Sequence, residues 1–165
     1  MIAGAGSQTD EFYMSVAIAQ ARRAMRLKNP PIGAVVVIGD KLVSKAYNSN
    51  TSGRTWLGHA EQTAMRRAAT HLRFAGEVSK ERRVLYSTLQ PCLMCFSTAI
   101  FCRIDHIVFG AADPHCGHSN LDITTTPDWY RRRLPGATGG ILAAECASLL
   151  DSYIPTPPFE AVEDR

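Results

Sequence analysis

Two short blocks of the sequence combine residue types that bind metal ions and move protons. A His-x-Glu block contains His59 and Glu61, and a Pro-Cys-x-x-Cys block contains Cys92 and Cys95. Imidazole nitrogen and cysteine thiolate are preferred zinc ligands, and a carboxylate beside them can act as a general acid and base. The two blocks together predict one Zn²⁺ per chain, held by His59, Cys92 and Cys95.

A site with three protein ligands is typical of catalytic zinc, because a structural zinc is usually closed by four. In the remaining tetrahedral position, zinc would lower the pKa of a water molecule to about 7 and make hydroxide available to attack an electrophilic ring carbon. Glu61 is not needed as a ligand, so it could take the water proton and later protonate a departing amine. On a substrate with a ring amino group this chemistry would be hydrolytic deamination, with Glu61 as the catalytic residue.

Each block alone also fits other kinds of site. A Cys-x-x-Cys pair occurs in redox centres and in structural zinc sites, and a single histidine is more often structural than catalytic. A closed structural site would need a fourth ligand, and the candidates are Cys102, Cys116, His115 and His118. We interpret Cys102 and Cys146 as packed thiols instead, because their helical phase suits burial.

The segment around His115, Cys116 and His118 follows the last clearly predicted strand, where α/β sheets usually bind ligands. We predict that His115 and His118 contact the substrate, and a second metal site in this segment stays open as an alternative. His71 and His106 are interpreted as structural.

Both blocks are predicted to begin a helix. Ala60 and Ala64 recur at helical spacing after the polar loop 48–58. Cys92 and Cys95 open a helix directly after an apolar strand, so both thiols face one side, where the positive end of the helix dipole favours thiolate. The first turns of two helices would therefore carry all of the candidate residues.

The remaining hydrophobic pattern predicts the α/β class, with a mixed sheet of four or five strands and helices on both faces. Runs at 34–38 and 41–47 flank a Gly-Asp turn and predict a hairpin. Strand 84–89, helix 92–102 and strand 104–109 predict a parallel crossover. Further helices are predicted for an N-terminal segment ending near residue 28, for 60–71, for 142–153 and, as a short helix, for 129–134.

The composition fits one compact domain. The chain has 165 residues, of which 45% are hydrophobic, and we predict a single domain at 1–154 followed by a proline-rich acidic tail at 155–165. It has no apolar run of the ~20 residues that cross a bilayer and no signal-peptide pattern, so we expect a cytoplasmic protein outside the membrane. The net charge of +3 and the small arginine groups permit nucleic-acid binding without indicating it.

The two blocks in this order are the described signature of zinc nucleobase deaminases, and residues from about 31 to 152 resemble the cytidine deaminase superfamily. The similarity includes Pro-Ile-Gly-Ala-Val-Val-Val from residue 31, Val-Phe-Gly-Ala from residue 108 and Gly-Ile-Leu-Ala-Ala-Glu-Cys-Ala from residue 140. It is to the branch that contains tRNA adenosine deaminases, guanine deaminases and fungal-type cytosine deaminases.

This resemblance implies a three-layer α/β/α fold with about five strands and a homodimer. It also implies that the Asn48 side chain hydrogen-bonds the substrate ring and that residues 134–140 form the last strand, which their glycines and proline predict to be short. Backbone N–H groups of Ala60 and Cys92, at the two helix starts, could stabilise developing negative charge.

Three departures from tRNA adenosine deaminases bear on the substrate. A Thr-Trp-Leu-Gly stretch ending at residue 58 replaces their Asp-Pro-Thr-Ala, a Pro-His-Cys-Gly-His stretch ending at residue 118 replaces a lysine-containing loop, and the tail is acidic where theirs is basic. Trp56 could stack on a flat ring or lie in a protein interface. We predict a small-molecule substrate, a purine-like free base or nucleoside. The alternatives are a tRNA adenosine deaminase, a cytosine or cytidine deaminase, and a catalytically silent zinc-stabilised interaction module.

Overall fold

The computed structural model describes residues 8–78 and 81–153, without the side chains of residues 74–78. The predicted acidic tail at 155–165 lies outside the described residues. None of the helices in the described ranges has the length and apolar character needed to cross a membrane. The helices are α1 (Gln8–Arg26), α2 (Ala60–Arg67), α3 (Ala69–Val78), α4 (Leu93–Phe101), α5 (Asp128–Arg131) and α6 (Ala143–Asp151), with a 3-10 turn η1 at His118–Asn120. The strands are β1 (Gly33–Ile38), β2 (Lys41–Tyr47), β3 (Arg83–Leu89), β4 (His106–Ala111) and β5 (Gly136–Gly139).

The five strands form one mixed sheet in the order β2-β1-β3-β4-β5. Strand β1 pairs antiparallel with β2 and with β3, whereas β3 and β5 each run parallel to β4. The β1–β2 hairpin turns at Gly39, whose φ of 59° suits glycine. The structure thereby confirms the α/β class with about five strands, the hairpin, and the parallel crossover through α4.

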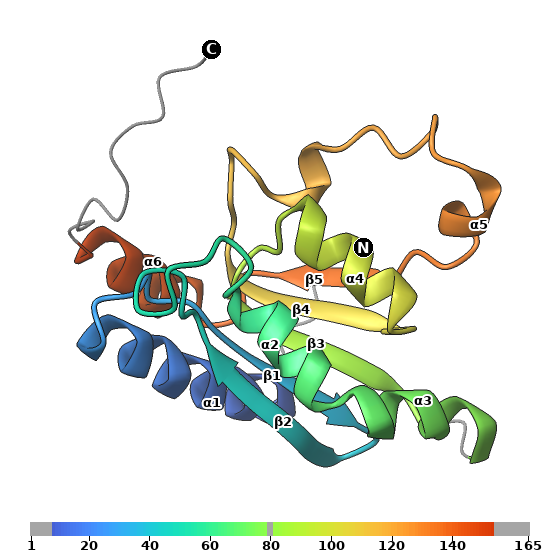
Figure 1. Cartoon of the computed structure of the whole chain (residues 1–165), viewed down its shortest axis with the longest axis horizontal. Coiled ribbons are helices and arrows are strands. Elements are labelled where there is room, and N and C mark those ends of the chain that lie inside the picture. The colour runs from blue at the N-terminus through green and yellow to red at the C-terminus, as the bar shows by residue number, and fades with distance from the viewer. Residues whose placement is uncertain (1–7, 79–80, 154–165) are drawn as a thin grey trace.

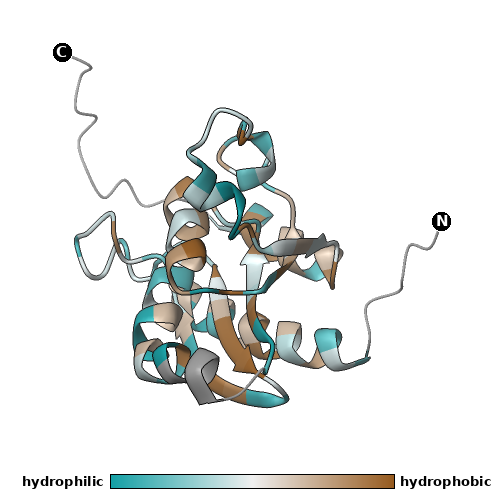
Figure 2. Ribbon diagram, turned by 90° about the vertical axis from the view of Figure 1, so that its right-hand side faces the viewer, coloured by the Kyte–Doolittle hydropathy of each residue, from teal (hydrophilic) through white to brown (hydrophobic). Residues whose placement is uncertain are grey.

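Helices cover both faces of the sheet in three layers (Figure 1). Helices α1 and α6 pack on one face, and α2 and α4 lie on the other. Alternate residues of β1 enter the two cores, with Val35 and Val37 on the α1 side and Val36 on the α2 side. All six residues of β1 are buried, and Figure 2 shows hydrophobic strands between helices of mixed hydropathy. The α/β/α arrangement is confirmed.

Small residues let α1 and α6 approach the sheet closely. A Cβ atom at Gly33 would lie 2.0 Å from the carbonyl oxygen of Ala17, which is itself fully buried. On β4, a Cβ atom at Gly110 would lie 2.3 Å from the Sγ of Cys146. The Cys146 thiol fills the space above Gly110, which confirms the prediction that it is packed.

The helix predicted for 60–71 is divided at Ala68 into α2 and α3. The Ala68 N–H still donates to the Ala64 carbonyl at 3.0 Å, and the Leu72 N–H donates to the Ala68 carbonyl at 2.9 Å. The backbone bonding therefore continues across the junction, and α3 extends beyond the predicted end, to residue 78.

Strand β4 begins at His106, two residues later than the predicted 104, because α4 ends in a tight left-handed turn. Arg103 has a φ of 54°, the Ile104 N–H donates to the Ala99 carbonyl at 2.9 Å, and the Arg103 N–H donates to the Ile100 carbonyl at 3.1 Å. These are the two bonds of a Schellman cap.

The fifth strand has four residues, as short as its glycines and Pro135 predict. A Cβ atom at Gly136 would lie 2.6 Å from the Nδ1 of His106, so glycine leaves room for the imidazole. The His106 Nε2 lies 2.8 Å from the Thr138 Oγ1. His106 therefore joins β4 to β5, which agrees with its predicted structural role.

Candidate metal centre and active site

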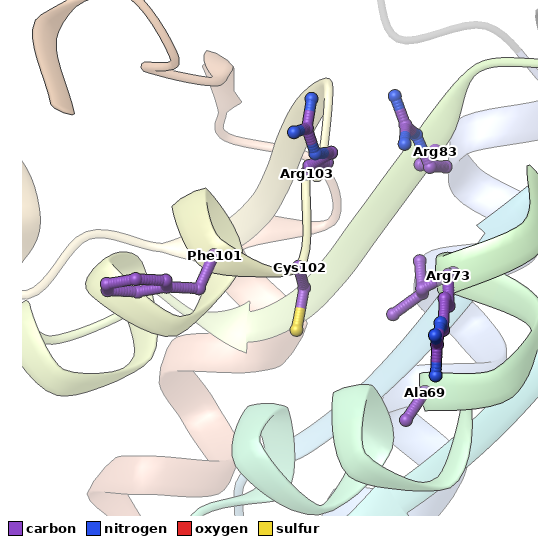
Figure 3. Close-up of a pocket in the computed structure, with 7 residues that line it drawn as sticks. Ala69, Arg73, Arg83, Phe101, Cys102 and Arg103 are labelled. Carbon is purple, nitrogen blue, oxygen red and sulfur yellow. The ribbon is translucent and has the colours of Figure 1, made fainter. Parts of the chain in front are cut away.

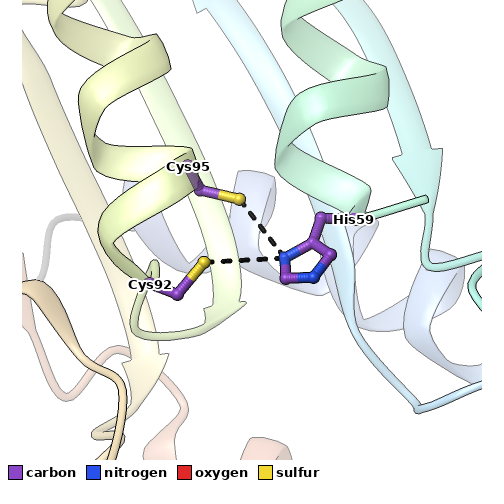
Figure 4. A group of neighbouring side chains, drawn as sticks. All are labelled: His59, Cys92 and Cys95. Atoms are coloured by element: carbon purple, nitrogen blue, oxygen red, sulfur yellow. Dashed lines mark hydrogen bonds between the residues drawn. The ribbon is translucent and has the colours of Figure 1, made fainter. Parts of the chain in front are cut away.

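The three predicted ligands lie at the starts of two neighbouring helices. His59 is the N-cap of α2, and Cys92 is the N-cap of α4, both with extended backbone angles. Cys95 follows one turn into α4 and is buried. Figure 4 shows both thiols and the imidazole of His59 pointing into the space between the helix starts.

The distances between the three donor atoms fit one shared zinc ion. The Nδ1 of His59 lies 3.6 Å from the Sγ of Cys92 and 3.5 Å from the Sγ of Cys95 (Figure 4). Zn–S bonds of about 2.3 Å and a Zn–N bond of about 2.0–2.1 Å, set at a tetrahedral angle, require an N···S separation of about 3.6 Å. The donor set also matches zinc chemistry, since it combines one imidazole with two thiols. The geometry and the donor set of these residues therefore fit a zinc ion.

Within residues 8–78 and 81–153, His59, Cys92 and Cys95 make up the one cluster of three or more potential ligands, and its donor atoms all lie within 4.8 Å of one another. No fourth Cys, His, Asp or Glu of these ranges belongs to it. The alternative of a closed site completed by Cys102, Cys116, His115 or His118 is therefore not supported, and neither is a second metal site in the 113–119 loop.

The protonation of the three groups is strongly coupled. The hydrogen bond to Cys92 raises the pKa of the His59 imidazole. Hydrogen bonds from Cys95 and then from His59 lower the pKa of the Cys92 thiol to about 4. Cys95 is the partner that keeps its proton, so the hydrogen bond to Cys92 and then burial raise the pKa of its thiol. Cys92 is a thiolate already, while a metal ion must displace the proton of Cys95.

Glu61 lies in the first turn of α2 and is 4% exposed. The hydroxyl of Ser87, near the end of β3, donates to the Glu61 Oε1 at 3.3 Å. Burial raises the pKa of the Glu61 carboxyl, in the direction that suits a group that both accepts and returns a proton near neutral pH. Glu61 is not part of the ligand cluster, which leaves its carboxylate available for proton transfer.

Asn48 and Trp56 lie at the two ends of the loop that precedes His59. The Asn48 side chain is 1% exposed, and its Oδ1 accepts a hydrogen bond of 2.9 Å from the Asn50 N–H. Trp56 is 67% exposed.

The side chain of Gln62 connects the two helices that carry the ligands. Its Nε2 donates to the Thr98 Oγ1 at 2.6 Å and to the Met94 carbonyl at 3.2 Å. Both acceptors belong to α4, next to Cys95. Gln62 therefore fixes the separation of α2 and α4, on which the distances within the zinc site depend.

The 113–120 loop is tied to the residues just before Cys92. Gln90 is buried, its Nε2 donates to the Ser119 Oγ at 2.8 Å, and its Oε1 accepts from the Asp113 N–H at 3.1 Å. The His118 N–H donates to the Pro91 carbonyl at 2.9 Å. The backbone that leads into Cys92 is thus held by this loop.

The two histidines of this loop occupy different environments. The ring of His118 is buried, stacks on Phe96 at a centroid distance of 4.6 Å and meets Phe109 edge-on at 6.0 Å. His118 therefore packs against α4, and of the two histidines only His115 stays predicted to contact the substrate. His115 is exposed and lines a hollow beside Cys92.

Ser87, Gln62 and Gln90 take part in the site without having been predicted. Ser87 had a detectable signal, because it is a polar residue near the end of an otherwise apolar strand that leads to the cysteines. Gln62 lies on a helix face where a glutamine is ordinary, and only the position of α4 reveals its contacts.

Comparison with known proteins agrees with the geometry. A family model described as "Cytidine and deoxycytidylate deaminase zinc-binding region" matches residues 7–111, a span that includes the metal cluster, Glu61 and Asn48. The chain is 32% identical over 144 residues to the tRNA-specific adenosine deaminase of Bacillus subtilis (strain 168), with 87% of this chain and 88% of that protein covered.

Solved structures also resemble this fold. One from a study of A-to-I editing at the wobble position of transfer RNA has a TM-score of 0.71 and 28% identity, and covers 84% of this chain and 99% of its own. The guanine deaminase from Nitrosomonas europaea has a TM-score of 0.71 at 21% identity, covering 93% of this chain and 86% of its own, which shows similarity of fold alone.

Replacing Gln62 with Met should weaken zinc binding although no ligand is removed. The substitution keeps the volume of the side chain and deletes both hydrogen bonds to α4. We expect the zinc affinity to fall about 10-fold, as it does when other residues that orient metal ligands are replaced. The measurement is zinc competition against a chromogenic chelator. Thr98→Val should give part of the same loss, and the double variant should lose less than the sum of the two. Wild-type affinity in Gln62→Met would contradict the bracing role.

Zinc affinity should fall as the pH is lowered. Because the pKa of Cys95 is raised, zinc displaces about one proton from this thiol at neutral pH, and a second from His59 once the pH falls below the raised pKa of that ring. The affinity should therefore drop about 10-fold per pH unit near neutrality and more steeply below it. Chelator competition at several pH values measures this, with Cys95→Ala expected to bind zinc poorly throughout. If the zinc affinity did not change between about pH 5 and about pH 8, this coupling would be contradicted.

Proposed function

We propose that this chain, which belongs to the family of cytidine and deoxycytidylate deaminases, acts on a purine-type ring of a free base or nucleoside. As a zinc-dependent hydrolytic deaminase, it replaces a ring amino group by a carbonyl and releases ammonia. The observation that carries the choice of substrate class is the character of the surface next to the zinc site.

A surface hollow borders the ligand Cys92. Its lining residues are Cys92, Leu93, Met94, His115, Cys116, Gly117, Asn120 and Leu121. Neither lysine nor arginine is among them, and most of the lining is apolar. RNA binding depends on cations that neutralise phosphates, so a hollow without them supports an uncharged small substrate.

We assign the proton transfers to Glu61. When bound, zinc supplies a nucleophilic hydroxide at neutral pH. The Glu61 carboxylate takes a proton from water and delivers it to the ring nitrogen. It then takes the proton of the hydroxyl group added to the ring carbon and passes it to the leaving amine, so that a carbonyl forms as ammonia departs. Its burial and its bond from Ser87 hold the carboxylate in place for these transfers.

Substrate contacts are assigned to groups at the same edge of the sheet. The Asn50 N–H fixes the amide of Asn48, which leaves its Nδ2 as a donor toward a ring acceptor. Backbone N–H groups of Ala60 and Cys92, at the starts of α2 and α4, would stabilise negative charge that develops on the ring. The exposed rings of Trp56 and His115 would contact the flat faces and edges of the base.

A second candidate is deamination of adenosine in a tRNA. It is favoured by the 32% identity to the Bacillus subtilis protein over nearly the whole of both chains. In that case binding must be tight, strongly salt-sensitive and directed at an anticodon stem-loop.

We also propose that the protein forms a homodimer. Leu93 and Phe101, at the two ends of α4, are 55% and 62% exposed, and such large apolar side chains are typical of protein interfaces.

Glu61→Ala should retain zinc and lose turnover. The carboxylate is outside the metal cluster, so metal analysis should find about one zinc per chain, while loss of the proton-transfer group should reduce kcat by at least about 100-fold. Ser87→Ala removes only the hydrogen bond to Glu61 and should have a smaller effect. Full activity in Glu61→Ala would overturn the assignment.

The substrate class is tested by ammonia release from zinc-loaded protein. The panel contains adenine, guanine, cytosine, their nucleosides and an anticodon stem-loop RNA. Turnover of a free purine or purine nucleoside supports the proposal. Inosine formation confined to the RNA would establish the second candidate, and a response to cytosine or cytidine alone would contradict the purine assignment.

A further inference from the structure

An arginine-lined pocket lies at the end of the molecule opposite the zinc site. It is a hollow of about 540 Å³ between the start of α3, the start of β3 and the end of α4. Its lining residues are Ala69, Leu72, Arg73, Arg83, Phe101, Cys102 and Arg103. Arg83 and Arg103 also line an adjoining hollow that contains Arg132 and Arg133, with Asp105 as its acidic residue.

Asp105 holds the Arg83 guanidinium group through two of its three nitrogens. Its Nε and one terminal nitrogen donate to the two carboxylate oxygens of Asp105 at 3.0 and 3.1 Å, and 14% of the side chain is exposed. The other terminal nitrogen is buried and has no acceptor within the described part of the chain. A buried N–H donor without a partner is unfavourable, so an acceptor that reached this nitrogen would be stabilising.

Arg103 lines the same two hollows as Arg83. Figure 3 shows both guanidinium groups directed to one side of the pocket, one from the end of α4 and the other from the start of β3. The left-handed backbone of Arg103, with a φ of 54°, places its side chain there as part of the cap of α4. Arg83 is paired with Asp105, so Arg103 is the less compensated charge on the wall of this hollow, and an anion bound there would be attracted to both guanidinium groups.

Simpler explanations account for some of these arginines. Helix α4 has no basic residue in its last turn, so Arg103 complements the negative end of the helix dipole. Arg132 lies 3.5 Å from Asp128, and Arg133 stacks on the ring of Trp129. Neither explanation covers the remaining buried donor of Arg83 or the fact that Arg83 and Arg103 line the same hollow.

We propose that this pocket binds the phosphate of a nucleoside phosphate. Guanidinium groups recognise phosphate through paired N–H···O bonds, and two neighbouring ones match a doubly charged group. The volume exceeds that of a phosphate ion and lies within the range of small-molecule sites. Ala69, Leu72 and Cys102 form an apolar part of the wall, against which the uncharged part of a nucleotide fits; the Cys102 sulfur points into this space (Figure 3).

The pocket is separate from the zinc site. Strand β3 runs from Arg83 toward Cys92, and its seven residues span about 20 Å. A nucleotide bound at Arg83 and Arg103 cannot place its own ring at the zinc site, so the pocket is a second binding site and no extension of the first. Helix α4 connects the two, with the cysteine ligands at its start and the arginine pocket at its end.

Binding to zinc-loaded protein tests the proposal by calorimetry with pyrophosphate, AMP and, as the uncharged control, adenosine. AMP and pyrophosphate should bind, and Arg103→Gln should weaken both by about 10-fold or more, since a charge-assisted pair is lost. Arg103→Lys keeps the positive charge but lacks the planar guanidinium group, so it should bind AMP and pyrophosphate little better than Arg103→Gln. Arg26→Gln, which removes the same charge from α1 on the other face of the sheet, should bind as wild type does.

Adenosine, which has no phosphate, should respond equally in wild type and Arg103→Gln. The proposal is overturned if AMP and pyrophosphate bind equally to wild type and Arg103→Gln, because the phosphate then lies elsewhere. Absence of binding to wild type would also overturn it. So would an Arg103-dependent interaction seen with a single-stranded RNA but with neither AMP nor pyrophosphate.

Discussion

Both helix starts that carry the zinc ligands are brought together by the pairing of β1 with its two neighbours. Strands β2 and β3 each run antiparallel to β1, so they run in the same direction and end at the same edge of the sheet. Tyr47 at the end of β2 is opposite Gly33, and Ser87 near the end of β3 is opposite Ala34. The chain leaves β2 toward α2 and leaves β3 toward α4, so the N-termini of both helices meet there.

Two neighbouring groups at this edge of the sheet need opposite shifts of their pKa values. Cys92 must be a thiolate to bind a cation, and hydrogen bonds to its neighbours lower its pKa to about 4. Glu61 must hold and release a proton, and its buried position raises its pKa. The two conditions coexist because helix-start dipoles and hydrogen bonds stabilise the sulfur, while the carboxyl is withdrawn from water beneath it. Ser87 holds the Glu61 carboxyl, and Gln62 links α2 to α4 beside the cysteines.

The sequence was most informative where a function is carried by neighbouring residues. His59, Glu61, Cys92 and Cys95 could be selected because each pair is separated by one or two residues at a helix start, and the type of nearly every major element follows from its hydrophobic period. Contacts between residues far apart in the sequence were harder to predict. His118 has the same loop context as His115, and only the packed position of Phe96 distinguishes a stacked ring from an exposed one. The turn at Arg103 likewise occurs at a residue type that rarely adopts a positive φ.

The pairing of β1 with β3 also makes formation of the zinc site depend on long-range contacts. Its pairing with β3 joins segments on either side of α2 and α3, and such non-local contacts form late and slowly compared with a hairpin or a single helix. Before that pairing His59 and the two cysteines are far apart on a flexible chain, and no tight zinc site exists. A tight zinc site therefore exists only once β1 and β3 have paired, so metal binding stabilises the same long-range pairing that creates the site.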